Sequence, residues 1–165
     1  MTTRHQTLIA AALVVLAAAC SETTAPIEAR AIVTVPDTLV TRPMSSSNAQ
    51  WMQLTIPVSI RNTASVPLTF SYCASGIEAQ NGGSWTNVWS PICALSSEAS
   101  LPILPGETRV VSMPLAAVIA GNGGPVWGTS TVEGTYRVLV ALVPEGFSGI
   151  IPTVSSNAFV LRQGN

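Results

Sequence analysis

The chain has 165 residues, a formal net charge of −1 and a mean hydropathy of +0.44, and only 9% of its residues are charged. No cluster of basic residues is present that would neutralise the phosphates of DNA or RNA, so we expect no nucleic-acid partner. Lysine is absent, the only histidine is His5 and the only aspartate is Asp37, which leaves few groups for acid–base catalysis or metal binding. The composition predicts a protein that is not an enzyme and holds neither a metal nor a cofactor.

The first feature along the chain is a short apolar run that ends at a cysteine. Arg4 gives a positive start, residues 8–19 are apolar, and the small residues 17–19 stand directly before Cys20. The run is shorter than the roughly 20 residues that span a bilayer, and it matches a cleavable signal. This layout is typical of a bacterial lipoprotein signal peptide over residues 1–19, with lipid attached to Cys20 after cleavage. The alternative is an ordinary secretory signal with an incidental cysteine.

Residues 20–30 are polar, contain Pro26 and predict a flexible tether between the lipid and a folded domain. Ser21 follows the cysteine, whereas lipoproteins kept at the inner membrane of a double-membrane cell usually have Asp there. We therefore expect an exported protein, attached through its lipid to the outer membrane of a double-membrane bacterium.

Alternation with a period of two dominates residues 31–165. Residues 31–35 and 38–41 predict an opening strand broken at Pro36, followed by a polar loop over residues 42–49. The clearest run places the apolar residues Met52, Leu54, Ile56, Val58 and Ile60 on one face, which indicates a half-buried strand. Pro57 lacks an N–H group, so this point of the strand should face an edge or a bulge. The alternation of residues 66–72 completes a hairpin with that strand.

Further short strands are predicted at residues 76–80, 85–89, 109–115, 134–143 and 154–162, with a brief helical turn at 116–120. The strand at 134–143 is apolar on both faces, which is typical of a central strand. No amphipathic helix of useful length is present. About seven to eight short strands at this spacing predict one all-β domain, an antiparallel β-sandwich over residues 31–165.

Once Cys20 is assigned to the lipid, two cysteines remain. In the oxidising cell envelope Cys73 and Cys93 are expected to form a disulfide. The alternative is a pair of buried free thiols.

A short motif gives the sandwich a more specific type. Residues 133–138, Glu-Gly-Thr-Tyr-Arg-Val, resemble the entry to strand F of immunoglobulin-like domains, where the tyrosine forms a corner. The order of this motif with residues 58–63, 67–70, 88–90 and 104–107 is similar to that of the bacterial intracellular proteinase inhibitor family and its immunoglobulin-like relatives. The resemblance implies an immunoglobulin-like fold in which the Tyr136 hydroxyl bonds to the preceding connection. The signal, Cys20 and the Cys73/Cys93 pair depart from that family, and no reactive loop matches, so no functional residue is transferred.

Three aromatic residues are candidates for a binding surface. Trp85 and Trp127 flank glycine-rich turns, and Phe147 lies in an apolar loop tip at residues 146–151. The alternatives are that the tryptophans fill the core, as is expected for Trp89, and that the loop folds onto the end of the sandwich.

These features predict a non-catalytic, lipid-anchored, immunoglobulin-like module of the cell envelope that acts by contact with a protein partner or a surface. An envelope proteinase inhibitor, which rests on the resemblance alone, is one alternative. A carbohydrate-binding sandwich that uses Trp85 or Trp127 is the other.

Overall fold

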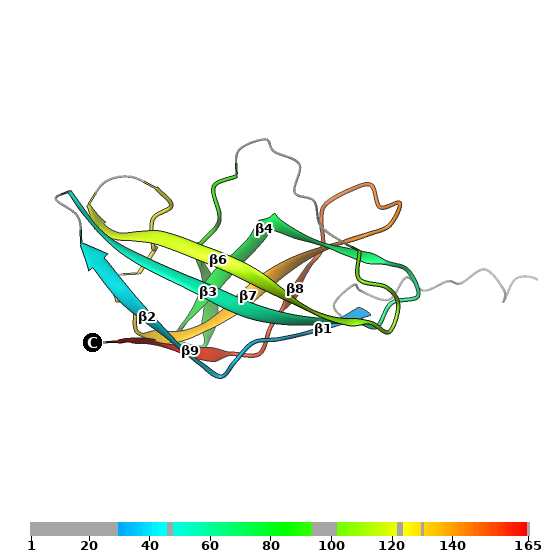
Figure 1. The fold of residues 1–165 in the computed structure, drawn as a ribbon, viewed down its shortest axis with the longest axis horizontal. Helices are drawn as coiled ribbons and strands as arrows, with labels where there is room; N and C mark the ends of the chain where they lie inside the picture. Colours follow the sequence, from blue (N-terminus) through cyan, green and yellow to red (C-terminus); the bar gives the residue numbers. More distant parts are fainter. Residues whose placement is uncertain (1–29, 46–47, 94–101, 122–123, 130, 165) are drawn as a thin grey trace, which may run out of the picture.

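The structure is a computed structural model that describes residues 30–45, 48–93, 102–121, 124–129 and 131–164 (Figure 1). The described residues form β-strands joined by turns, so the predicted all-β sandwich is confirmed. The strands are β1 (Ala31–Thr34), β2 (Thr38–Ser45), β3 (Ala49–Asn62), β4 (Leu68–Asn81), β5 (Ser84–Trp89), β6 (Thr108–Gly121), β7 (Gly134–Pro144), β8 (Thr153–Ser155) and β9 (Phe159–Gln163).

The strands lie in two layers. In one layer β3 pairs with β6 along one side and with β1 and β2 along the other; in the second layer β7 pairs with β4, β8 and β9, and β5 continues from β4. Strand β2 belongs to both layers, because residues 38–41 pair with β9 and residues 42–45 pair with β3. The β2–β9 pairing is parallel and the other pairings between described strands are antiparallel, so the sheet is mixed and not wholly antiparallel as the sequence predicts.

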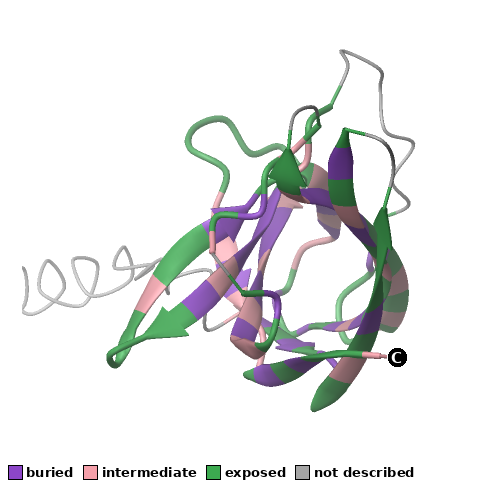
Figure 2. Cartoon of the chain, turned by 90° about the vertical axis from the view of Figure 1, so that its left-hand side faces the viewer, coloured by how far each residue is buried: buried purple, intermediate pink, exposed green. Residues whose placement is uncertain are grey.

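The core lies between the layers, where the buried residues gather on the inner side (Figure 2). Met52, Ile56, Val58 and Ile60 of β3 are fully buried, as the period-two pattern requires of one face of a strand. Strand β7 supplies Tyr136, Val138, Val140 and Leu142 from the opposite layer. It runs between β4 on one side and β8 and β9 on the other, in the central position that its two apolar faces predict.

Pro57 lies in β3, between the residues that pair with β2 (50–53) and those that pair with β1 (59–62). This edge of β3 is therefore unpaired at Pro57, and the missing N–H group costs no ladder hydrogen bond there. The expectation that Pro57 faces a break in the pairing is confirmed.

Two expectations about the elements are wrong. Residues 116–120 form no helical turn, because β6 continues through them and pairs with β3 along almost its whole length. Residues 42–45 were expected in a loop, yet they extend β2 and pair with β3. In both cases pairing with a long neighbouring strand prevails over local preference.

Residues 68–72 and 76–80 were expected as separate strands, but both belong to β4, which continues through a bulge at residues 72–75. Ser71 pairs with Ala141 and Gly76 with Leu139, so four residues of β4 lie opposite one residue of β7. The buried Ser75 hydroxyl accepts a hydrogen bond from Ala141 N (3.0 Å) and donates one to Ser71 O (2.6 Å). Ser75 thus replaces a backbone partner that the bulge removes.

Candidate functional site

The three aromatic candidates lie in different environments. Trp85, on β5, is half-buried, and the Arg137 guanidinium carbon lies 4.5 Å from its ring centroid. Arg137 also forms an ion pair with Glu78 (2.6 Å), so one face of Trp85 is already covered by a fixed cation. Phe147 is 41% exposed in the loop that follows β7.

Trp127 is only 3% exposed and belongs to the core, so it does not contribute to a binding surface. Its ring packs against Tyr136 with centroids 5.2 Å apart, which explains why a tryptophan beside a glycine-rich turn points inward. Trp89 is also buried, as expected, and its indole N–H donates to Ala116 O of β6 (3.1 Å).

The predicted disulfide is present. Cys73 and Cys93 are joined, with their Cα atoms 5.8 Å apart. Cys73 lies in the β4 bulge, so the bond fastens the chain that follows β5 to the outer side of the second layer. This connection marks one end of a groove.

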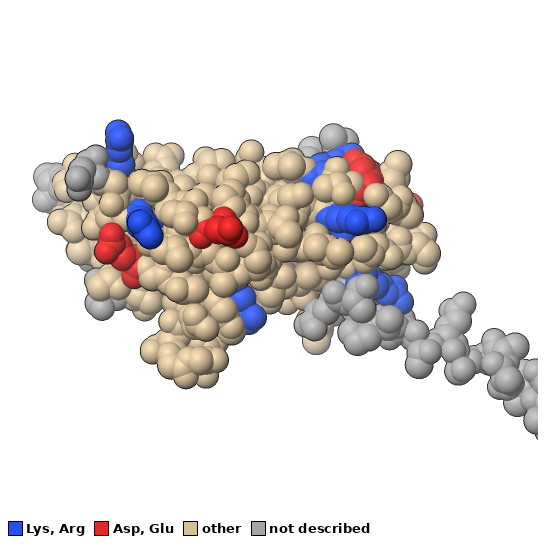
Figure 3. Space-filling model, turned by 90° about the horizontal axis from the view of Figure 1, so that it is seen from below, with Lys and Arg blue, Asp and Glu red and all other residues tan. Residues whose placement is uncertain are grey.

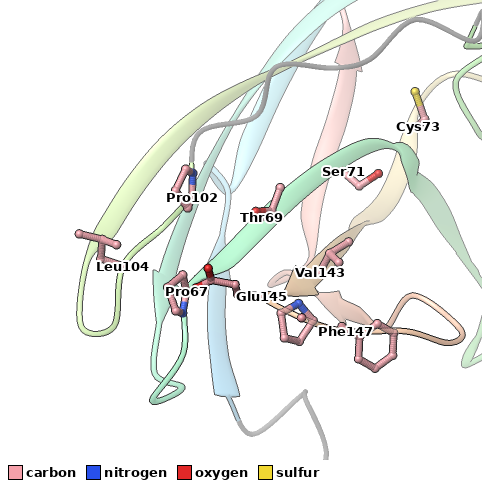
Figure 4. A pocket seen from close by; sticks show the side chains of 11 residues that line it. Pro67, Thr69, Ser71, Cys73, Pro102, Leu104, Val143, Glu145 and Phe147 are labelled. Atoms are coloured by element: carbon pink, nitrogen blue, oxygen red, sulfur yellow. The ribbon is translucent and has the colours of Figure 1, made fainter.

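The groove lies on the outer face of β4 and β7 and has a volume of about 860 Å³ (Figure 4). Thr69 and Ser71 of β4 and Val143 of β7 form its floor, because they alternate with the core residues Leu68, Phe70 and Leu142. Its full lining comprises Pro67, Thr69, Ser71, Cys73, Pro102, Leu104, Val143, Pro144, Glu145, Gly146 and Phe147.

One wall of the groove is positioned by a buried amide. Asn62 is fully buried at the end of β3, and its Nδ2 atom donates to Val66 O (2.8 Å) and Ile103 O (2.9 Å). Its Oδ1 atom accepts from Ala64 N (2.8 Å). Ile103 also exchanges two backbone hydrogen bonds with Leu68, at 3.0 and 2.7 Å. These bonds fix the segment that presents Leu104 to the groove.

The other wall is the beginning of the loop between β7 and β8. Glu145 N donates to Pro67 O (3.0 Å) and Phe147 N donates to Pro144 O (3.0 Å). Gly146 has φ of 73°, which an L residue adopts only with strain, and this turn directs Phe147 along the groove.

The groove offers binding contacts of few kinds: apolar surface from prolines, Leu104, Val143 and Phe147, two hydroxyls from Thr69 and Ser71, and the exposed carboxylate of Glu145. Such a surface suits an extended, largely apolar segment with one or two polar groups. Among the described residues no three His, Cys, Asp or Glu side chains gather at one place.

Charges are sparse on the surface of the sandwich (Figure 3). Beside the groove, Glu107 accepts a hydrogen bond from Leu104 N (2.7 Å) and pairs with Arg109 (2.6 Å). The backbone N–H of Leu104 and then the Arg109 side chain lower the pKa of Glu107 below its usual value. The ionised Glu107 carboxylate thereby holds the backbone at Leu104.

Of the site residues predicted from the sequence, the structure brings Phe147 and Cys73 to one groove and leaves Trp85 elsewhere. Cys20 lies outside the described residues. The Tyr136 hydroxyl donates to Val132 O (2.9 Å), the geometry of a tyrosine corner. Sequence reasoning missed Thr69, Ser71 and Leu104; the first two were visible as the polar positions of an alternating strand.

No family model and no curated protein matches this chain. A solved structure described as the X-ray structure of Northeast Structural Genomics Consortium target SoR45 is similar over 81% of this chain and 87% of its own, with 14% identity and a TM-score of 0.44. Within the described residues no helix is long and apolar enough to cross a membrane.

Proposed function

We propose that this chain is a non-catalytic, lipid-anchored module of the cell envelope, with an immunoglobulin-like domain that acts by contact with another protein. The observation that supports it most is the groove between Leu104 and Phe147, which offers apolar surface and hydroxyls on a rigid sheet. Protein recognition requires shape, apolar anchors and a few polar groups, and the groove has all three.

The anchor in this proposal comes from the sequence: the apolar run at residues 8–19 and the small residues before Cys20. The partner that fits the groove is an extended apolar segment of a protein. The carbohydrate alternative has less support, since Trp127 is buried and Trp85 is covered on one face by Arg137.

Fractionation of the producing cell tests the anchor. The wild-type chain should be recovered with membranes, and Cys20→Ser should be released because the acceptor thiol of the lipid is lost. If Cys20→Ser remains with membranes as the wild type does, the anchor is wrong.

Photo-cross-linking tests the groove. A photoreactive residue at position 104 should form an adduct with an envelope protein, and the same residue at position 126 should not. Leu104 and Val126 are matched as apolar residues with 54% and 64% exposure, but Val126 lies far from the groove. Equal adducts at both positions would contradict a groove-specific contact, and inhibition of a serine proteinase by the mature chain would favour the inhibitor alternative.

A further inference from the structure

The end of the sandwich that holds the groove is also the end at which the described chain begins. Arg30 O accepts a hydrogen bond from Thr63 N (2.7 Å), in the connection between β3 and β4. In the same connection Pro67 O accepts from Glu145 N (3.0 Å), at the start of the loop after β7. Arg30 and the loop at residues 145–151 therefore lie at one end of the molecule, on the right in Figure 1. We call it the amino-terminal end.

This end presents a cluster of apolar side chains to solvent. Ile150 is 93% exposed, Phe147 41% and Ile151 39%, all in one loop. Leu104, on the opposite wall of the groove, is 54% exposed. An almost completely exposed isoleucine beside further exposed apolar residues marks a surface that another apolar phase covers.

Two arginines add positive charge to the amino-terminal end. Arg30 precedes β1 and Arg61 stands opposite Ile32 near the end of β3. Among the described residues neither has an ion pair, whereas Arg109 is paired with Glu107. Figure 3 shows basic side chains at the end where the described chain begins. Unpaired arginines next to an apolar tip are typical of surfaces that bind anionic lipid headgroups.

We infer that the amino-terminal end docks on the lipid bilayer, with Ile150 and Ile151 inserted at the interface and Arg30 and Arg61 near the headgroups. The inference rests on the proposed lipid anchor. Residues 20–29 reach at most about 35 Å when fully extended, so a lipid on Cys20 holds this end close to the bilayer. The short tether favours the bilayer over a second copy or a soluble partner, because the bilayer is always within reach.

The test holds the mature chain on vesicles without using the natural lipid. The protein comprises residues 20–165 with Cys20→Ser and carries a histidine tag before residue 20. The tag binds it to vesicles that contain a nickel-chelating lipid and phosphatidylglycerol. The chain has no histidine after His5, so the tag alone attaches it. An environment-sensitive fluorophore is placed on Ile150→Cys or, as the control, on Val126→Cys, which is 64% exposed at the far end of β6. Lipids that carry bromine on their acyl chains serve as quenchers.

We expect the fluorophore at position 150 to shift its emission to the blue and to lose intensity with the brominated lipid, and the fluorophore at position 126 to do neither. The inference would be overturned if the brominated lipid quenched neither fluorophore, or quenched both to the same extent. A blue shift at position 150 without quenching would indicate contact with a second copy and would also overturn it. Because the tag replaces the lipid, failure here is distinct from failure of the anchor, which the fractionation of Cys20→Ser decides.

Discussion

The two ends of the sandwich are built from different interactions. At the far end the Tyr136 ring lies between Trp127 and Phe159, with centroid distances of 5.2 and 6.1 Å, and all three side chains are buried. At the amino-terminal end the central group is the buried amide of Asn62, and large apolar side chains such as Ile150 are exposed.

The contrast supports the proposal that one end stabilises the sandwich and the other end makes contacts. Aromatic packing closes the far end, where Trp127 is buried against Tyr136. Hydrogen bonds from one amide order the connections at the other end without covering their apolar surface. Trp127, Tyr136 and Phe159 are buried at one end, whereas Phe147 and Ile150 are exposed at the other, and this difference supports the proposal that the second end makes contacts.

The largest effect is expected from Asn62→Ala, which tests whether one amide orders the amino-terminal end. The variant removes the amide bonds to Val66 O and Ala64 N and one of the two hydrogen bonds that Ile103 O accepts, so we expect a loss of about 4 kcal/mol in the free energy of unfolding, measured with urea. Asn157→Ala is the matched control, because that amide also bonds to backbone atoms of Val35 but is only partly buried. Equal losses in the two variants would contradict a special role for Asn62.

The disulfide comes next, because Cys73 lies at one end of the groove and its bond to Cys93 holds the chain there. Reduction of the Cys73–Cys93 bond opens a closed loop with a sequence separation of 20, and we expect a loss of about 3 kcal/mol. Urea melts of the oxidised and reduced chain measure it. Amide exchange at Ala141, whose N–H donates to Ser75 of the bulge, should accelerate more than exchange at Tyr136. Coincident melts would show that the bond adds nothing to stability.

A smaller effect is expected at the far end from Tyr136→Phe. The variant keeps the ring packing and removes the hydrogen bond to Val132 O, so it should cost about 1–2 kcal/mol. Tyr72→Phe is the control, since its hydroxyl donates to Pro114 O in an exposed position and its loss should cost less. If Tyr136→Phe has the same free energy of unfolding as the wild type, Tyr136 stabilises the fold by ring packing alone.

The smallest effect concerns the pH dependence of the amino-terminal end. The pKa of Glu107 is lower in the folded chain than in the unfolded chain, so the unfolded state binds more protons between the two values and stability falls as the pH is lowered through that range. Glu107→Gln should be less stable than the wild type at neutral pH, and the difference should disappear in acid below the folded-state pKa. A difference that is independent of pH would mean that the charge of Glu107 is not what holds Leu104.

Much of the sandwich can be predicted from the sequence, because the pattern of apolar and polar residues along a strand indicates which of its faces are buried. The alternation at Met52–Ile60, the two apolar faces of residues 134–143 and the corner motif at Tyr136 are local signals, and the Cys73/Cys93 pair follows from the number of cysteines left after Cys20. The same holds for Phe147, which stands in an apolar turn between glycines.

The groove could not be predicted in full, because it depends on pairings between distant segments. The bulge at residues 72–75 is visible only when β4 is set against β7, and Leu104 reaches the groove only because Asn62 binds Ile103. Trp127 stands beside glycines, as an exposed residue would, and only its contact with Tyr136 shows that it is buried. Parallel pairing of β2 with β9 brings residues 38–41 beside residues 160–163, and no local sequence pattern predicts that these two distant segments pair.

The most direct test of the anchored orientation is the mass of the amino-terminal peptide from protein purified out of membranes. Trypsin cuts after Arg30, and the chain contains no basic residue between Cys20 and Arg30, so one peptide reports the anchor. We expect a peptide that begins at Cys20 and carries the added mass of acyl chains on that cysteine. A peptide that begins at another residue, or one with an unmodified Cys20, would contradict the lipid anchor and with it the assignment of the amino-terminal end to the membrane.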